Sequence, residues 1–154
     1  MSTAESREHK FELRLALDQA YVLRDALELY FRIGIGQFTE VVKSHNYPHF
    51  RDRCDFHAEV EAAEKDLNSA GRLLTGLPWG SYYSINSAEV SVGTKHACSM
   101  YDVVRKALWE ERKRTDPEVR KMGYHTHNND PINYVPAVPL AVMERIDDQE
   151  RKPK

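Results

Sequence analysis

Two histidines separated by one residue, His125 and His127, stand in the most polar stretch of the chain, GYHTHNNDPINYVP (residues 123–136). On an extended backbone, side chains two positions apart point the same way, so both imidazoles could bind one metal ion with Asp130 as third ligand. No HExxH, no paired CxxC and no further ligand of fixed spacing accompanies them. We therefore predict no metal site here, and a metal-dependent hydrolase built on these three residues is a remaining alternative.

A second stretch, residues 77–93, combines aromatic rings with short hydrogen-bonding side chains. Tyr82 and Tyr83 can stack on a planar ligand, and Asn86 can bind the edge of such a ring. The stretch precedes a helix expected from about Thr94, whose first N–H groups favour an anion. The alternative is a structural loop whose tyrosines fill the core, and the sequence leaves both interpretations open.

Arginines form the third candidate set. Arg24, Arg32 and Arg105 carry guanidinium groups of the kind that bind phosphate in a bidentate manner, and Lys106 adds a further charge. Glu28 stands between Arg24 and Arg32 at helical spacing. A solvated face of ion pairs is therefore the default interpretation of that part of the set.

The sequence gives little support for catalysis. It contains no GxSxG, no P-loop and no Rossmann glycine signature. His96 and Cys98 are two residues apart on an expected helix and so do not face each other. We predict no catalytic residue and no cofactor.

The hydrophobic pattern predicts a mainly helical α+β domain. Leucines alternate with polar residues over residues 10–17, which is typical of a strand with one buried face. The expected elements are an N-terminal strand (10–17), a long helix (19–44), two further helices (55–75 and 94–114), a helical turn from Asp116-Pro117-Glu118, and a C-terminal strand (139–146). A polar, disordered lead (1–9) precedes one globular domain (10–146), and a charged tail (147–154) follows it.

Two features of the long helix indicate close packing and self-association. Gly34 and Gly36 each cost about 1 kcal/mol relative to alanine in a helix, so we expect a neighbouring element to approach the backbone there. The apolar arc is wide, because Val22, Leu29 and Ile33 form a second stripe beside the first. Such an arc favours contact with more than one neighbour, and we predict a homo-oligomer, most simply a two-fold dimer.

Composition excludes several classes of protein. The chain has 154 residues and a formal net charge of −2, which disfavours nonspecific nucleic-acid binding. Its two cysteines, Cys54 and Cys98, are not in a CxxC pair and indicate free thiols in a reducing compartment. The N-terminus has no apolar signal segment, and no stretch approaches the length of a membrane span. We therefore expect a cytoplasmic protein that does not enter a membrane.

Four segments resemble small proteins encoded in phages and prophages: LELYFRIGIGQFTEVV (27–42), SYYSIN (81–86), CSMYDVVRKALW (98–109) and NYVPAVPLAVME (133–144). The resemblance implies a phage origin and action in the cytoplasm of a bacterial host. Non-catalytic, oligomeric phage proteins include anti-defence sponges, which sequester nucleotide signals of bacterial immunity. The resemblance carries no binding residue over to this chain.

These observations lead to the hypothesis of a non-catalytic binding protein that sequesters a nucleotide-like ligand between subunits of a dimer or larger homo-oligomer. An aromatic ring would stack on the base, an amide would bind its edge, and cationic side chains would meet phosphate. The expected ligand-binding residues are Tyr82, Tyr83, Asn86, Arg105, His125 and His127. The alternative is a protein that inhibits a host protein by direct contact, whose sign would be a large exposed apolar patch.

Overall fold

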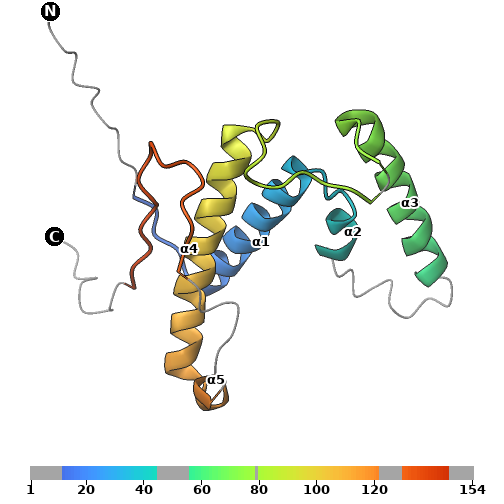
Figure 1. Ribbon diagram of the computed structural model, residues 1–154. Coiled ribbons are helices and arrows are strands. Elements are labelled where there is room, and N and C mark those ends of the chain that lie inside the picture. Colours follow the sequence, from blue (N-terminus) through green and yellow to red (C-terminus); the bar gives the residue numbers. More distant parts are fainter. Residues whose placement is uncertain (1–11, 45–55, 79, 122–129, 146–154) are drawn as a thin grey trace, which may run out of the picture.

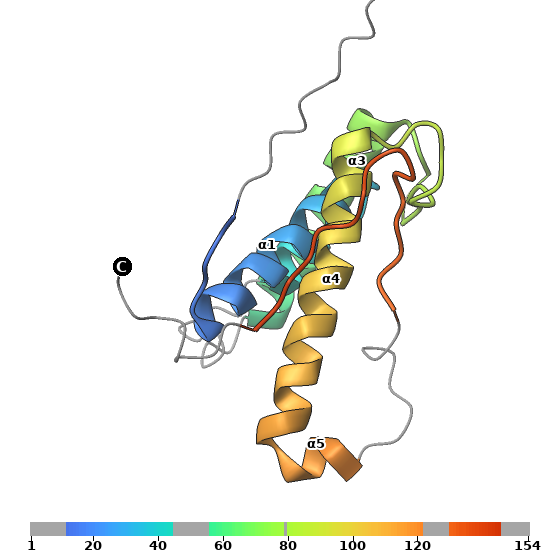
Figure 2. The same cartoon turned by 90° about the vertical axis from the view of Figure 1, so that its left-hand side faces the viewer.

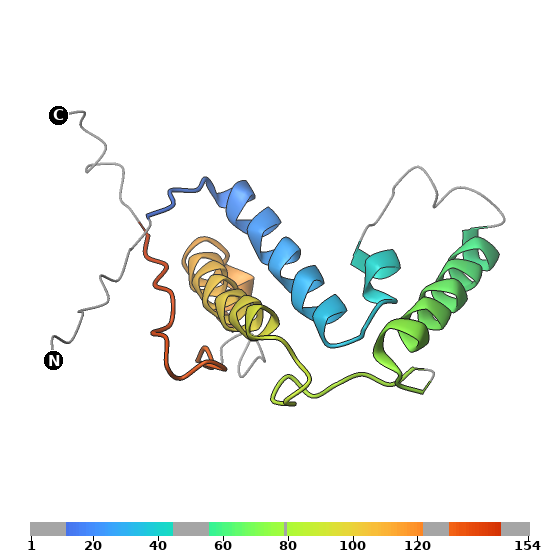
Figure 3. The same ribbon diagram turned by 90° about the horizontal axis from the view of Figure 1, so that it is seen from above.

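A computed structural model describes residues 12–44, 56–78, 80–121 and 130–145 as a helical protein. Its helices are α1 (Leu17–Gly34), α2 (Glu40–Ser44), α3 (Phe56–Thr75), α4 (Val92–Thr115) and α5 (Pro117–Lys121). α1 and α4 lie side by side in the centre, and α3 stands apart beyond α2 (Figures 1 and 3). No helix of the described part is long and apolar enough to cross a membrane.

The α+β prediction is wrong, because no strand forms within the described ranges. Residues 12–16 and 139–145, the described parts of the two predicted strands, have no assigned secondary structure and pair with no other strand in the described ranges. Leu15 packs against the helices, whereas Leu13 and Leu17 are 72% and 54% exposed. A two-residue period shows only that the backbone is extended, and a sheet also needs a neighbouring strand. The ends of both predicted strands, residues 10, 11 and 146, lie outside the described ranges.

The predicted long helix over residues 19–44 is divided into α1 and α2. α1 begins after Ala16, whose backbone N–H donates to the Gln19 side chain at 2.9 Å. Asp18 lies in the first turn, where a carboxylate interacts favourably with the helix dipole. Gly36 has a φ of +93°, a left-handed conformation that ends the helix and that glycine adopts without strain.

At Gly34 the backbone of α1 lies against Thr94 of α4. A Cβ atom at this position would touch Thr94 Oγ1 and would lie 2.6 Å from Thr94 Cγ2. The prediction that a glycine here admits a neighbouring element is therefore confirmed. Ala20, near the other end of α1, packs against Val104 and Leu108 of α4. The two helices are thus antiparallel and in contact along most of α1 (Figure 2).

The core is small and is centred on this hairpin. One cluster joins the C-terminal half of α1 to the start of α4 and to Val90, and the second joins Ala20 to the middle of α4. The sequence predicts an α4 stripe of Ala97, Tyr101, Val104 and Leu108; Ala97, Val104 and Leu108 are buried in these clusters, whereas Tyr101 is only partly buried. Among described residues, eleven apolar side chains are buried but thirteen large apolar side chains are exposed. Within the described ranges, much of the apolar surface is therefore uncovered.

Side-chain caps set the limits of α4 and α5. Ser91 caps α4, because its Oγ accepts a hydrogen bond from the Thr94 N–H at 3.1 Å. The predicted start at Thr94 is therefore late by two residues. Asp116 caps α5 as predicted, since its carboxylate accepts from the Glu118 N–H at 2.9 Å and Pro117 occupies the first helical position.

The C-terminal segment, residues 130–145, packs along one side of the hairpin. It first runs towards the start of α4, where the Tyr134 N–H donates to Ser99 Oγ at 3.0 Å. The chain then turns, with the Val138 N–H donating to the Val135 carbonyl at 3.0 Å. The returning part crosses the hairpin, and Met143 packs on the second core cluster (Figure 2).

Candidate functional site

The loop before α4 holds three of the predicted ligand-binding residues in different surroundings. Tyr83 is half-buried against the first core cluster, and its hydroxyl donates to the Thr75 carbonyl at 3.0 Å. Its backbone N–H donates to the Ile35 carbonyl at 2.8 Å. Tyr82 is 57% exposed, and Asn86 is exposed. Tyr83 thus anchors the loop to α1 and α3, whereas Tyr82 and Asn86 face solvent.

Arg105 lies about 20 Å along α4 from Val92, since thirteen residues at ~1.5 Å each separate the two. Its guanidinium pairs with Asp102 at 3.1 Å and lies over the Tyr101 ring, 5.6 Å from the centroid. Both contacts are within α4. The structure therefore places Arg105 among partners of its own helix and apart from the exposed side chains of the loop.

The remaining predicted ligand residues, His125 and His127, lie outside the described residues. Asp130, their proposed third metal ligand, is described; it is exposed and lies 3.8 Å from Lys106 Nζ. Among the described residues, no group of three or more histidine, cysteine, aspartate or glutamate side chains lies close enough together to bind one metal ion.

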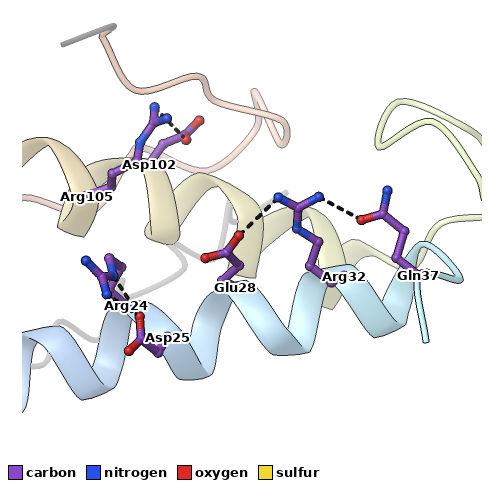
Figure 4. A network of polar contacts seen from close by, with 7 residues as sticks. All are labelled: Arg24, Asp25, Glu28, Arg32, Gln37, Asp102 and Arg105. Atoms are coloured by element: carbon purple, nitrogen blue, oxygen red, sulfur yellow. Dashed lines mark hydrogen bonds and ion pairs between the residues drawn. The ribbon is translucent and has the colours of Figure 1, made fainter. Parts of the chain in front are cut away.

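The arginines that the sequence suggested for phosphate come from α1 (Arg24 and Arg32) and α4 (Arg105), and each has a carboxylate partner (Figure 4). Arg32 pairs with Glu28 at 3.0 Å, as the helical spacing predicted, and also donates to the Gln37 side chain at 2.8 Å. Arg24 pairs instead with its neighbour Asp25, with Nε 2.8 Å from the carboxylate. With Asp102 on Arg105, three guanidinium groups face three carboxylates. A phosphate would have to displace one of these carboxylates.

Beside these ion pairs, α4 presents buried polar groups that hold the C-terminal segment. Ser99 Oγ accepts the Tyr134 N–H at 3.0 Å, and Asp102 and Cys98 lie beside Ile132 and Tyr134. Burial raises the pKa of Asp102, although Arg105 and the Ile132 N–H oppose that shift. Burial, followed by the charge of Asp102, raises the pKa of the Cys98 thiol to about 11. Cys98 is thus a protonated packing residue at neutral pH, not a nucleophile.

An open apolar groove of about 340 Å³ lies between α1 and α4. Its lining contains no carboxylate, guanidinium or ammonium group, and consists of Leu23, Ala26, Leu27, Tyr30, Gly93, His96, Ala97 and Met100. Small-molecule sites of this size combine apolar walls with a few convergent polar groups. Only Tyr30 and His96 bring polar side-chain atoms to this groove. It therefore resembles the centre of a protein interface more closely than a nucleotide site.

A second apolar surface lies on α3, which makes few contacts with the rest of the described chain. Gly71 packs against the Phe38 ring, and the Thr75 carbonyl accepts the Tyr83 hydroxyl. Leu73 and Leu74 are 88% and 74% exposed. No apolar side chain described on this 20-residue helix is buried, although its sequence is amphipathic.

Sequence reasoning named the apolar arc of α1 but missed both of these surfaces as sites. For the surface on α1 the signal was present, because Val22, Leu29 and Ile33 form a stripe in excess of what one neighbour can cover. Which side of the hairpin stays open depends on where the C-terminal segment packs, and local periodicity does not contain that information.

Comparison of the chain with protein-family models, with curated proteins and with solved structures found no significant match.

Proposed function

We propose that this protein acts without catalysis, by binding another protein through α3. One observation carries the proposal: α3 is an amphipathic helix of 20 residues whose described apolar side chains are all at least partly exposed. Most helical stability in proteins comes from packing of an amphipathic face rather than from intrinsic propensity. A partner that covers this face would supply the missing packing.

The charge on α3 indicates the chemistry of that partner. The helix carries four carboxylates and two basic residues, Lys65 and Arg72. Two of the carboxylates, Glu59 and Asp66, border the stripe that contains Val60, Ala63 and Leu67 on one side, and Glu64 borders it on the other. The complementary surface is an apolar groove with lysines or arginines along its rim, the usual arrangement when an amphipathic helix binds in a groove.

The test is capture of the partner with matched variants of the same helix. Leu74→Glu places a carboxylate on the exposed apolar face, whereas Ser69→Glu places the same group on the opposite, exposed side. Both purified chains and the wild type would be used as bait in a lysate of the organism of origin. A protein captured by wild type and by Ser69→Glu would then be purified and titrated by calorimetry.

We expect Leu74→Glu to weaken binding of that protein at least about tenfold, because a desolvated carboxylate has no counterpart in an apolar groove. Ser69→Glu should bind as the wild type does. Equal affinity of all three chains would refute α3 as the binding element. Circular dichroism of the free variants would show that each keeps its helices.

The nucleotide-like ligand stays a prediction, and its test is separate. Native mass spectrometry of freshly purified protein would detect a bound mass of several hundred daltons released on denaturation. The paired arginines and the apolar groove lend this ligand less support than α3 lends a protein partner. The predicted cytoplasmic location belongs to the proposal too, and the free, buried thiol of Cys98 fits a reducing compartment.

A further inference from the structure

The hairpin of α1 and α4 has two sides, and the described chain covers only one of them. On the covered side lie the loop residues Tyr83 and Ile85 and the C-terminal segment, which pack against Phe31, Ile35 and Cys98. Arg24, Glu28 and Arg32 of α1 belong to this side as well, as their contacts in Figure 4 show.

The other side is the apolar groove. On α4, helical spacing places His96 and Met100 across the buried ridge of Ala97 and Val104 from Cys98 and Asp102. Met100 is 40% exposed. The C-terminal segment, which packs beside Cys98 and Asp102, therefore lies on the other side of α4 from the groove.

On α1, the apolar face extends beyond the groove itself. Tyr30 is 57% exposed, Val22 69% and Ile33 36%, and Ala26 between them is exposed too. No charged residue interrupts this stripe. Two adjacent helices thus present one continuous uncharged apolar face, formed by the groove lining together with Val22, Leu29 and Ile33.

We propose that this face binds the same face of a second copy of the chain, so that two hairpins form a four-helix bundle with two-fold symmetry. In a two-fold contact the same surface of both copies meets, so a charged side chain on that surface would face charges of the same sign on the other copy and be repelled. This face has none. The chain as a whole carries a net charge of only −2, so repulsion between two copies is small. The proposal is independent of the partner assigned to α3.

The size of the face agrees with a weak, reversible dimer. The face runs over residues 22–33 of α1, so it is about 18 Å long, and two helices ~9 Å apart and ~10 Å thick give a width of about 19 Å. The flat area is therefore on the order of 350 Å², against about 800 Å² of accessible surface per partner in a standard interface. Interdigitating side chains bury more than the flat area, so we expect a dissociation constant on the order of ten micromolar.

The full chain would be studied by sedimentation equilibrium from about 1 µM to about 200 µM, a range that brackets this constant. The expected result is a reversible monomer–dimer equilibrium. Ala26→Glu and Met100→Glu each place a carboxylate in the face, one on each helix, and each should raise the dissociation constant at least about tenfold. Ala26 is exposed and glutamate is a good helix former, so Ala26→Glu will fold even if Met100→Glu does not.

The control variants are Met100→Leu, which keeps the face apolar, and Leu74→Glu, which places a carboxylate on α3. Both should dimerise as the wild type does. A wild-type chain that stays monomeric over the whole range would overturn the proposal. So would a dimer that dissociates in Leu74→Glu and persists in Ala26→Glu, because the second copy would then bind at α3. Loss of the α3 partner alone leaves the dimer unaffected, so the two proposals fail separately.

Discussion

The contact of Gly34 with Thr94 gives the sharpest prediction. In Gly34→Ala the new methyl group would lie 2.6 Å from Thr94 Cγ2 and 3.0 Å from Thr94 Cβ. Carbon atoms in contact are normally ~3.5–4.0 Å apart, so the overlap is about 1 Å. Thr94 cannot turn away freely, because its Oγ1 lies 2.9 Å from Ser91 Oγ in the cap of α4.

Overpacking of this kind costs about 1–3 kcal/mol. Alanine regains at most about 1 kcal/mol of helix propensity, and less at the last residue of α1. The expected net loss is about 1–2 kcal/mol in the free energy of unfolding, or a fall in Tm of about 2–8 °C for a chain of this size. Urea unfolding followed by circular dichroism, at one fixed protein concentration, would measure it.

Gly93→Ala is the matched control, one residue away from Thr94. A Cβ at Gly93 would meet the Tyr30 hydroxyl oxygen at 3.4 Å, an ordinary contact, and would otherwise have room. This variant should be unchanged or more stable by up to about 1 kcal/mol. A double variant with Thr94→Ala should recover part of the loss of Gly34→Ala, because two of the three crowded atoms are gone. If Gly34→Ala were as stable as Gly93→Ala, the helices could not be packed as described.

Two further predictions concern α4. Ser91→Ala removes the cap that accepts the Thr94 N–H, so it should lower the free energy of unfolding by about 1 kcal/mol in the same urea assay, and no loss would show that Ser91 is not the cap. For Asp102, burial raises the pKa above the unfolded value of 3.8, so the folded state binds the proton more tightly. The stability that this carboxyl contributes is then complete below the unfolded pKa and is lost as pH rises through the folded pKa. Asp102→Asn lacks this dependence, so the wild type should exceed the variant in stability by a larger margin at about pH 4 than at about pH 7. A margin that stays constant or shrinks at the lower pH would contradict the burial of Asp102.

Much of the local structure follows from the sequence because local rules decide it. The predicted helix over 55–75 forms as α3, Asp116 and Pro117 open α5, and Ala97, Val104 and Leu108 form the buried stripe of α4. Helical periodicity and side-chain caps act within a few residues, so each of these features is encoded where it occurs.

What the sequence could not decide is how segments far apart in the chain meet. The extended residues 12–16 and 139–145 could pair as strands or lie on helices, and the alternation of leucines is compatible with both. The break at Gly36 depends on a φ of +93°, which one glycine in a helical pattern does not specify. The predicted ligand residues were grouped by chemical type, yet Tyr83 anchors a loop while Arg105 pairs within α4.

The sequence by itself determined that α1 has more apolar surface than one neighbour covers. Only the tertiary structure decided which part of that surface the described residues leave open, because the C-terminal segment packs on the side of Cys98 and Asp102 and not on the side of Ala26 and Met100. Burial depends on contacts between residues far apart in sequence. An amphipathic pattern therefore predicts that an apolar face will be buried, while the fold determines whether another part of the same chain buries it.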